Sequence, residues 1–136
     1  MAKQGVEPDE LTREFWRAAS EDRLVIQNCK ACDRLQHPPL ARCSECASAD
    51  HLEWKPMCGR GTIYNYGVVH DGPIRSLHPD QPFNVAVIKL EEDAGIQMFS
   101  HLPGTPSDEV PVGAQVEVIF EASENGQKVP EWRGGT

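Results

Sequence analysis

The stretch from Asn28 to Ser48, NCKACDRLQHPPLARCSECAS, holds four of the chain's five cysteines in two Cys-x-x-Cys pairs. Each pair can form a tight turn that points two sulfurs at one ion, and two such turns make a tetrahedral sulfur cage. Ten residues separate the pairs, which is enough for a short hairpin arm. The spacing therefore predicts one bound metal ion with four ligands: Cys29, Cys32, Cys43 and Cys46.

Four thiolates fill the coordination sphere, whereas a catalytic zinc keeps one position open for water. The site is therefore predicted to stabilise the fold and not to perform chemistry. Iron is the alternative metal, because a four-sulfur site also suits redox iron. Such an iron site usually has glycines beside its cysteines, and Asp33 and Ala47 stand there instead, which favours zinc. His37, inside the arm, is expected to lie at the surface or to pack on the prolines.

A helix is predicted near the N-terminus, from the sequence PDELTREFWRAASEDR at residues 8–23. Asp9 is a candidate N-cap, and Phe15 and Ala19 share one face of the helix. Trp16 widens this apolar stripe. Two roles for the aromatic pair stay open: it packs on the chain's own ribbon, or it anchors a partner protein.

Strand patterns dominate the chain after about residue 52, with β-branched and aromatic runs separated by loops that hold Gly and Pro. A short strand, RLVIQN, also leads into the first cysteine pair. Five strands cannot form a protected open sheet without cover, so a small closed or nearly closed barrel is predicted. Its five expected strands lie within residues 61–71, 82–93, 95–102, 114–123 and 128–133.

Charge and hydropathy argue against two classes of partner. The 136 residues carry a net charge of -8, and residues 53–136 hold six Lys or Arg against twelve Asp or Glu. Nucleic acid prefers a basic surface, so it is not expected to bind. The chain lacks an apolar run of membrane-spanning length and a signal-peptide core. It is therefore expected to be cytoplasmic and to make no membrane contact, in a compartment where paired cysteines usually bind metal.

Candidate catalytic sets are weak in this sequence. One loop holds His70, Asp71, Arg75 and His78, which can bind an anionic group such as a CoA phosphate, although a solvated polar loop is the alternative. We keep His70, Arg75 and His78 as a candidate ligand rim. Cys58 is expected as a half-buried core thiol, because a reactive thiolate needs a neighbouring base or positive charge. No catalytic residue is predicted.

The order of these features resembles one known family. The marks are the aromatic pair Phe15 and Trp16, the four cysteines, two prolines in the ribbon arm, and the motif GxGxIY at residues 59–64. They resemble the acyl-CoA-associated proteins that join an N-terminal helix, a rubredoxin-like zinc ribbon and a C-terminal OB-fold. The likeness covers nearly the whole chain. The departures are Asp33 and Ala47, where glycine is common, and the C-terminal WRGGT.

The resemblance implies a mainly β fold in three parts. These are an N-terminal helical segment (residues 1–24), a zinc ribbon (25–52) and a five-stranded OB-fold barrel (53–136). It also implies one structural zinc ion per chain, held by the four cysteines. Members of the family assemble with thiolase-like enzymes, and catalysis resides in the thiolase-fold subunit.

The implied function is that of a non-catalytic accessory subunit, which docks on and stabilises a thiolase-fold enzyme acting on acyl-CoA thioesters. The implied reaction is retro-aldol cleavage, of the type used in steroid side-chain degradation, or a thiolase reaction. Phe15 and Trp16 would face the partner, and acyl-CoA would lie at or near the interface. Two alternatives stay open: a stand-alone acyl-CoA-binding module and a redox iron carrier.

Overall fold

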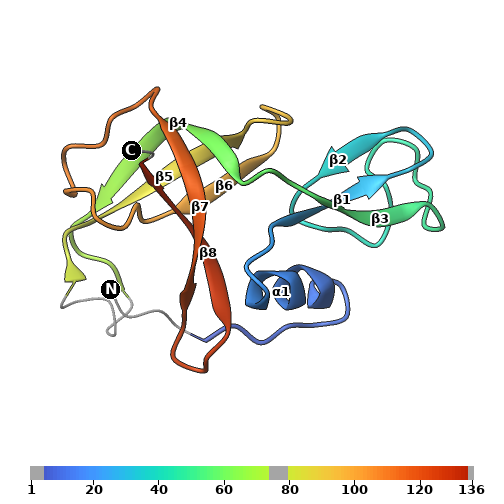
Figure 1. Ribbon diagram of the computed structural model, residues 1–136, viewed down its shortest axis with the longest axis horizontal. Coiled ribbons are helices and arrows are strands. Elements are labelled where there is room, and N and C mark those ends of the chain that lie inside the picture. Colours follow the sequence, from blue (N-terminus) through green and yellow to red (C-terminus); the bar gives the residue numbers. More distant parts are fainter. Residues whose placement is uncertain (1–4, 74–79, 135–136) are drawn as a thin grey trace.

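The fold is mainly β, as predicted. The computed structural model describes residues 5–73 and 80–134. Figure 1 shows a small sheet on one side, a larger barrel on the other, and a short helix between them. Among the described residues, no helix is long and apolar enough to cross a membrane.

The helix α1 spans Arg13–Ser20 and begins later than predicted. Asp9 does not cap it: the Asp9 carboxylate accepts hydrogen bonds from the Thr12 N–H and hydroxyl, each at 2.8 Å. These bonds close a separate turn, which leaves Thr12 at the N-cap position. The prediction of Asp9 as the cap is wrong because its side chain bonds a backbone group ahead of the helix.

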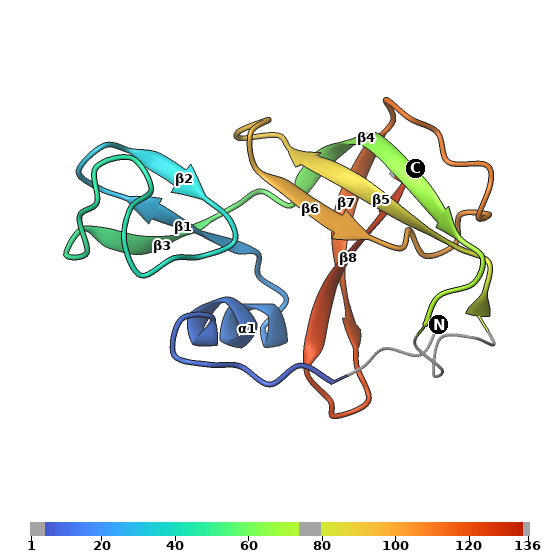
Figure 2. The same ribbon diagram turned by 180° about the vertical axis from the view of Figure 1, so that it is seen from behind.

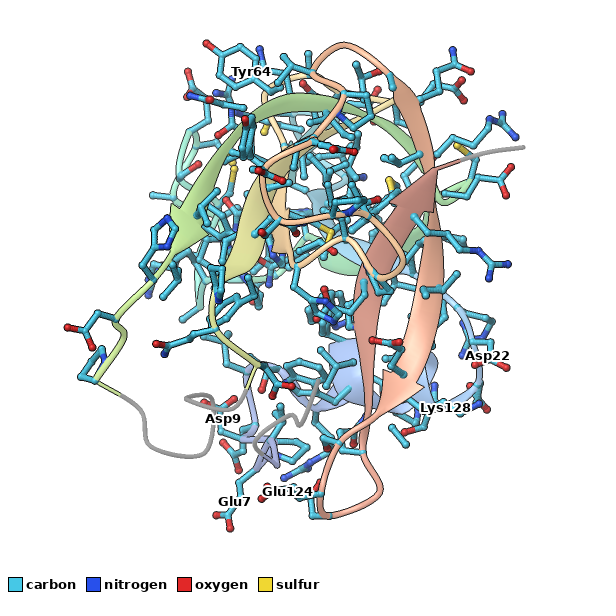
Figure 3. All side chains as sticks on the ribbon, turned by 90° about the vertical axis from the view of Figure 1, so that its left-hand side faces the viewer. Glu7, Asp9, Asp22, Tyr64, Glu124 and Lys128 are labelled. Atoms are coloured by element: carbon cyan, nitrogen blue, oxygen red, sulfur yellow. The ribbon has the colours of Figure 1, made fainter. Side chains whose placement is uncertain are left out.

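The hairpin of strands β7 (Gln115–Ala122) and β8 (Lys128–Gly134) holds α1 in place through polar contacts. The Gln127 side-chain amide donates to the Trp16 carbonyl at 2.9 Å and to the Ser20 hydroxyl at 3.0 Å. Lys128 pairs with Asp22, just after the helix, at 2.8 Å, and Figure 3 shows these two side chains next to each other. The helix is therefore attached to the barrel as well as to the ribbon.

The ribbon is an antiparallel sheet with strand order β2-β1-β3. Its strands are β1 (Val25–Cys29), β2 (Arg34–Gln36) and β3 (Leu52–Pro56). Because β3 pairs along its whole length with β1, the ribbon sheet extends to Pro56. The expected division between residues 52 and 53 passes through this strand.

The barrel has five antiparallel strands in the order β6-β5-β4-β7-β8, which confirms the five predicted strands. A register shift between Ile63 and Asn65 lets the long strand β4 bend, as barrel curvature requires. The strands are β4 (Arg60–Val69), β5 (Phe83–Leu90), β6 (Gln97–Ser100), β7 (Gln115–Ala122) and β8 (Lys128–Gly134).

Side chains close the seam between the two edge strands β6 and β8. The buried Glu131 carboxylate accepts from the Ser100 hydroxyl at 2.7 Å and from the His101 N–H at 3.1 Å. The Ser100 hydroxyl in turn accepts from the Trp132 N–H at 2.8 Å. The barrel is thus nearly closed: hydrogen bonds that involve the Glu131 and Ser100 side chains join β6 and β8 in place of backbone-to-backbone hydrogen bonds.

The GxGxIY motif has a steric explanation at the entry to β4. Gly59 has a φ of 79°, a left-handed conformation that favours glycine. At Gly61, a Cβ atom would lie 2.7 Å from the Ile88 side chain and 2.7 Å from the Lys89 carbonyl oxygen. Both glycines let β4 approach its neighbours closely, and Ile63 then packs in the core with Ile88 and Trp132.

Candidate metal centre and docking groove

The structure gathers the four predicted cysteines at one end of the ribbon. Their sulfur atoms all lie within 4.8 Å of one another. The Sγ atoms of Cys29 and Cys46 are 3.7 Å apart, and those of Cys32 and Cys43 are 3.4 Å apart. A tetrahedron with metal–sulfur bonds of about 2.3 Å has edges of roughly 3.8 Å, so the arrangement fits a tetrahedral ion.

Backbone geometry and backbone donors shape this cage. Asp33 and Ala47, each directly after a cysteine pair, have φ angles of 51° and 60°. The N–H groups of Cys46 and Glu45 lower the pKa of Cys43 to about 6. The Cys43 sulfur, by contrast, raises the pKa of Cys32 to about 12. Four thiolates so close together need a cation to offset their charge, and a bound metal would supply it.

Four sulfurs would leave a bound tetrahedral ion no open position for water or substrate, so a metal held here would have a structural role. It can link the turn after β1 to the loop before β3. None of its ligands is in a disulfide.

A buried pair of amides supports the arm between the cysteine pairs, and the sequence analysis missed it. The Gln36 side chain donates to the side-chain oxygen of Gln27 and accepts from the Ser44 N–H at 2.9 Å. Gln27 also bonds the backbone N–H and carbonyl of Leu40, each at 2.9 Å. Glutamine in a short strand carries no distinctive pattern, so this network could be found only from the structure.

An apolar groove of about 460 Å³ lies where the helix, the ribbon arm and the barrel meet. Figure 2 shows α1 between the ribbon and the β7–β8 hairpin. The ribbon arm contributes His37, Pro38 and Pro39 to the lining, and the barrel edges contribute residues of β6 and β8. The groove therefore uses all three parts of the chain.

The predicted aromatic pair lies in this groove, but its two members differ in exposure. Phe15 is buried in the chain's own core, whereas Trp16 is half-buried and packs edge-on against it, with ring centroids 4.9 Å apart. Beside them, Phe99 on β6 is 71% exposed. The alternation of β6, which buries Met98 and Ser100, points Phe99 outward. That period-two pattern was the sequence signal that could have identified Phe99.

The candidate ligand rim is described only in part. His70 is exposed at the end of β4, and Arg75 and His78 lie outside the described residues. The structure therefore places no two members of this set together.

The prediction for Cys58 is wrong, because this residue is exposed and not part of the core. Its thiol donates to the Glu91 carboxylate at 3.2 Å. Local burial and the Glu91 and Glu92 carboxylates raise the pKa of the thiol, and Arg60 pairs with Glu91 at 2.8 Å. This environment disfavours a thiolate nucleophile.

Two family models match consecutive parts of the chain. The ChsH2 rubredoxin-like zinc ribbon domain matches residues 16–51, and the ChsH2 C-terminal OB-fold domain matches residues 54–121. A solved structure titled "Ltp2-ChsH2(DUF35) aldolase" is 28% identical, covers 97% of this chain and 100% of that chain, and has a TM-score of 0.84. A DUF35-family protein of Sulfolobus solfataricus, 14% identical, covers 93% of this chain and 86% of its own at a TM-score of 0.63, a likeness of fold alone.

Two named relatives are also similar to most of this chain. A protein of Thermomonospora curvata named "Probable enoyl-CoA hydratase alpha subunit" is 35% identical, over 88% of this chain. The chain spans only 36% of that relative's length. A "DUF35 domain-containing scaffold protein" of Methanocaldococcus jannaschii is 29% identical, over 82% of this chain and 78% of the relative. With both halves matched in order, the chain belongs to the ChsH2 family, in which a rubredoxin-like zinc ribbon precedes a C-terminal OB-fold domain.

Proposed function

We propose that this chain is a non-catalytic accessory subunit that docks on a thiolase-fold enzyme acting on acyl-CoA thioesters. The proposed reaction of the complex is retro-aldol carbon–carbon cleavage, with a thiolase reaction as the second choice. Support comes from the solved structure titled as an aldolase, whose match covers 97% of this chain. The chemistry of the chain agrees, because its metal centre is closed and its free thiol is not activated.

The apolar groove is the observation that carries the docking proposal. A phenylalanine that is 71% exposed, beside a half-buried tryptophan and two prolines, leaves apolar surface that a partner can cover. Aromatic side chains at the centre of an apolar patch are the usual anchors of an interface. The occupant we propose is an apolar segment of the thiolase-fold subunit. Its contact residues would be Trp16 and Phe99. Phe15 would support Trp16 from the core side, where the two rings pack together.

The metal we propose is zinc, one ion per chain, held by the four cysteines. The sulfur geometry suits any tetrahedral thiophilic ion, and the match to a rubredoxin-like zinc ribbon favours zinc over iron. We further propose that acyl-CoA lies near the subunit interface, with His70, Arg75 and His78 at its rim.

The test is to purify a tagged chain from its source organism and to identify the co-purifying subunit by mass spectrometry. We expect a stoichiometric thiolase-fold protein. Trp16→Ala and Phe99→Ala should each weaken its binding by tenfold or more, about the loss of one hot-spot side chain. Tyr64→Ala is the matched control, because Tyr64 is also an exposed aromatic (54%) but lies outside the groove. Figure 3 shows it at the opposite end of the molecule from Asp9 and Glu124.

Circular dichroism of each variant separates lost binding from lost folding. Equal binding by the groove variants and by Tyr64→Ala would place the interface elsewhere. A chain that retains no thiolase-fold subunit and binds acyl-CoA alone would support the stand-alone binding module instead.

A further inference from the structure

The strand β6 has one edge that the sheet leaves unpaired, and the apolar groove lies beside it. β6 stands at the end of the strand order, so its backbone ladder joins it to β5 on one side only. Three of its residues, Gln97, Met98 and Phe99, line the groove together with residues 129–131 of β8. Figure 2 shows β6 on the side of β5 that faces α1. The groove therefore lies between two strand edges that no backbone ladder connects within the described structure.

The register of β5 and β6 determines which backbone groups point toward this edge. In an antiparallel pair, residues that exchange backbone hydrogen bonds alternate with residues that do not. The Leu90 N–H donates to the Ile96 carbonyl at 3.1 Å. Two residues further along β6, Met98 is the next to bond β5, so the N–H and C=O groups of Gln97 and Phe99 point away from β5.

A proline is one reason why β8 does not pair with this edge. The Ser123 N–H donates to the Gln127 carbonyl at 2.9 Å, and by the same alternation residues 130 and 132 of β8 turn their backbone groups away from β7. The Trp132 N–H then reaches the Ser100 hydroxyl of β6, at 2.8 Å. Pro130, in the groove, has no N–H to donate. β8 therefore offers the β6 edge no backbone donor at this point.

A partner that covers the exposed Phe99 ring would also exclude water from the edge beside it. Backbone N–H and C=O groups that lose water without gaining a new partner destabilise a complex. A docked helix cannot pair with them, because its own backbone groups are bonded within the helix. An extended segment can, because its free N–H and C=O groups have the same spacing as those of β6. The edge therefore favours an extended occupant over a helical one.

The charge of the groove limits the side chains that this occupant can carry. Among the described lining residues, Glu131 is the one carboxylate, and there is no lysine or arginine. The Glu131 carboxylate already accepts from the Ser100 hydroxyl and the His101 N–H. Most of the remaining lining is apolar and includes Trp16 and Pro39. Alternate side chains of an added strand point to one face, so those that enter the groove should be uncharged and apolar.

We propose that the thiolase-fold subunit adds an extended, uncharged segment to the free edge of β6. The backbone of this segment pairs with the N–H and C=O groups of Gln97 and Phe99, and its alternate apolar side chains enter the groove. The identity of the partner rests on the proposed function, whereas the unpaired edge follows from the register of β5 and β6. The backbone hydrogen bonds fix the position of the segment along β6, which apolar contacts alone do not.

The first experiment is amide hydrogen exchange, followed by NMR, on the metal-loaded full chain with and without the co-purified thiolase-fold subunit. In the free chain, the Met98 amide should exchange slowly and the Gln97 and Phe99 amides rapidly, because only Met98 donates to β5. In the complex, the two rapid amides should slow by tenfold or more. Gln97 and Phe99 amides that are already slow in the free chain, or still rapid in the complex, would overturn the proposal.

The second experiment removes one donor of the edge. Gln97→Pro deletes an N–H that points away from β5, and proline is tolerated at the first residue of an edge strand. Gln97→Ala is the matched variant, because it loses the same side chain but keeps the N–H. Gln97→Pro should bind the thiolase-fold subunit about tenfold more weakly than Gln97→Ala does. If circular dichroism shows that the proline variant is unfolded, an ester in place of the Phe99 amide, which keeps the ring, should give the same loss.

The outcomes separate this proposal from the proposed function. Assembly that depends on the Trp16 and Phe99 rings but not on the two N–H groups overturns the added strand and leaves the proposed function standing. If no thiolase-fold subunit co-purifies, the proposed function fails, and its added strand fails with it. A dimer of the free chain that Gln97→Pro dissociates, measured by analytical ultracentrifugation, would show that the edge pairs with a second copy and would overturn the partner segment.

Discussion

Asp33 and Ala47 show, at the scale of single residues, that the four-cysteine cage forms without a glycine after either cysteine pair. Both have φ angles in the left-handed region, 51° and 60°, a conformation that favours glycine. The backbone still delivers the Glu45 N–H to the Cys43 sulfur, at 3.4 Å. The absence of glycine therefore does not by itself distinguish zinc from iron, and the sequence-based argument against iron is weaker than expected.

Replacing Ala47 with glycine is expected to stabilise the folded chain. An L-residue in the left-handed conformation destabilises the folded chain by roughly 1–2 kcal/mol, and glycine avoids this strain. Glycine in turn destabilises the folded chain by about 0.5–1 kcal/mol, because it has more conformational freedom to lose on folding. Ala47→Gly should therefore raise the free energy of unfolding by about 0.5–1 kcal/mol in urea titrations. Ala49→Gly, also exposed but without a positive φ, should lower it. The strain argument fails if both substitutions destabilise equally.

His37 is expected to make the chain sensitive to acid. Burial lowers the pKa of its imidazole below 6.5, and its Nδ1 is buried without a partner among the described residues. Because the unfolded chain takes up the proton first, His37 contributes stability above about pH 6.5 that is lost as the pH falls toward its folded pKa. His37→Gln should reduce the loss of stability between pH 8 and pH 6, measured by urea unfolding with excess zinc.

The exposed His70 supplies the control for this measurement. His70→Gln should keep the pH dependence of the parent chain. If His37→Gln and His70→Gln behave alike, the acid sensitivity arises elsewhere.

The ribbon shows, at the scale of elements, why a metal is needed. Its three short strands carry few buried apolar side chains beyond β1, and the arm is held by Gln27 and Gln36 and by the cysteines. A sheet so small is marginal without a further constraint. Metal binding can contribute on the order of 10 kcal/mol, enough to decide whether the ribbon forms.

Removing the metal is therefore expected to unfold the ribbon. We expect one zinc per chain by elemental analysis, no visible colour, and a lower melting temperature by circular dichroism after treatment with a strong chelator. Cys43→Ser should lose the zinc, because a ligand is missing. Cys58→Ser, at the cysteine outside the cage, should retain it. Visible iron absorption, or a melting temperature unchanged by the chelator, would contradict the structural zinc centre.

The helix α1 is an element whose position depends on residues far away in the chain. Gln127 holds it through the Trp16 carbonyl, across more than a hundred residues of sequence. Phe15 enters the core, and this burial leaves Trp16 turned toward the groove. Phe15 thus packs on the chain's own core, and Trp16 is the member of the pair that is left for the proposed partner contact.

At the scale of the whole molecule, one core joins the parts. Phe15 of the helix and Ile26 of the ribbon belong to the same buried cluster as Ile88 and Trp132 of the barrel. The groove formed by all three parts therefore rests on one continuous core. A preformed surface of this kind would favour the proposed docking, because it loses less conformational entropy on binding.

The sequence by itself determined the four-cysteine cluster, the mainly β class and the five barrel strands. Cysteine spacing and period-two alternation are local patterns, and local patterns can be recognised without knowledge of the fold. Only the tertiary structure decided that Phe99 joins Trp16 and that Gln127 holds the helix. Each of these depends on residues distant in sequence meeting in space, and that meeting follows from the packing of the whole chain.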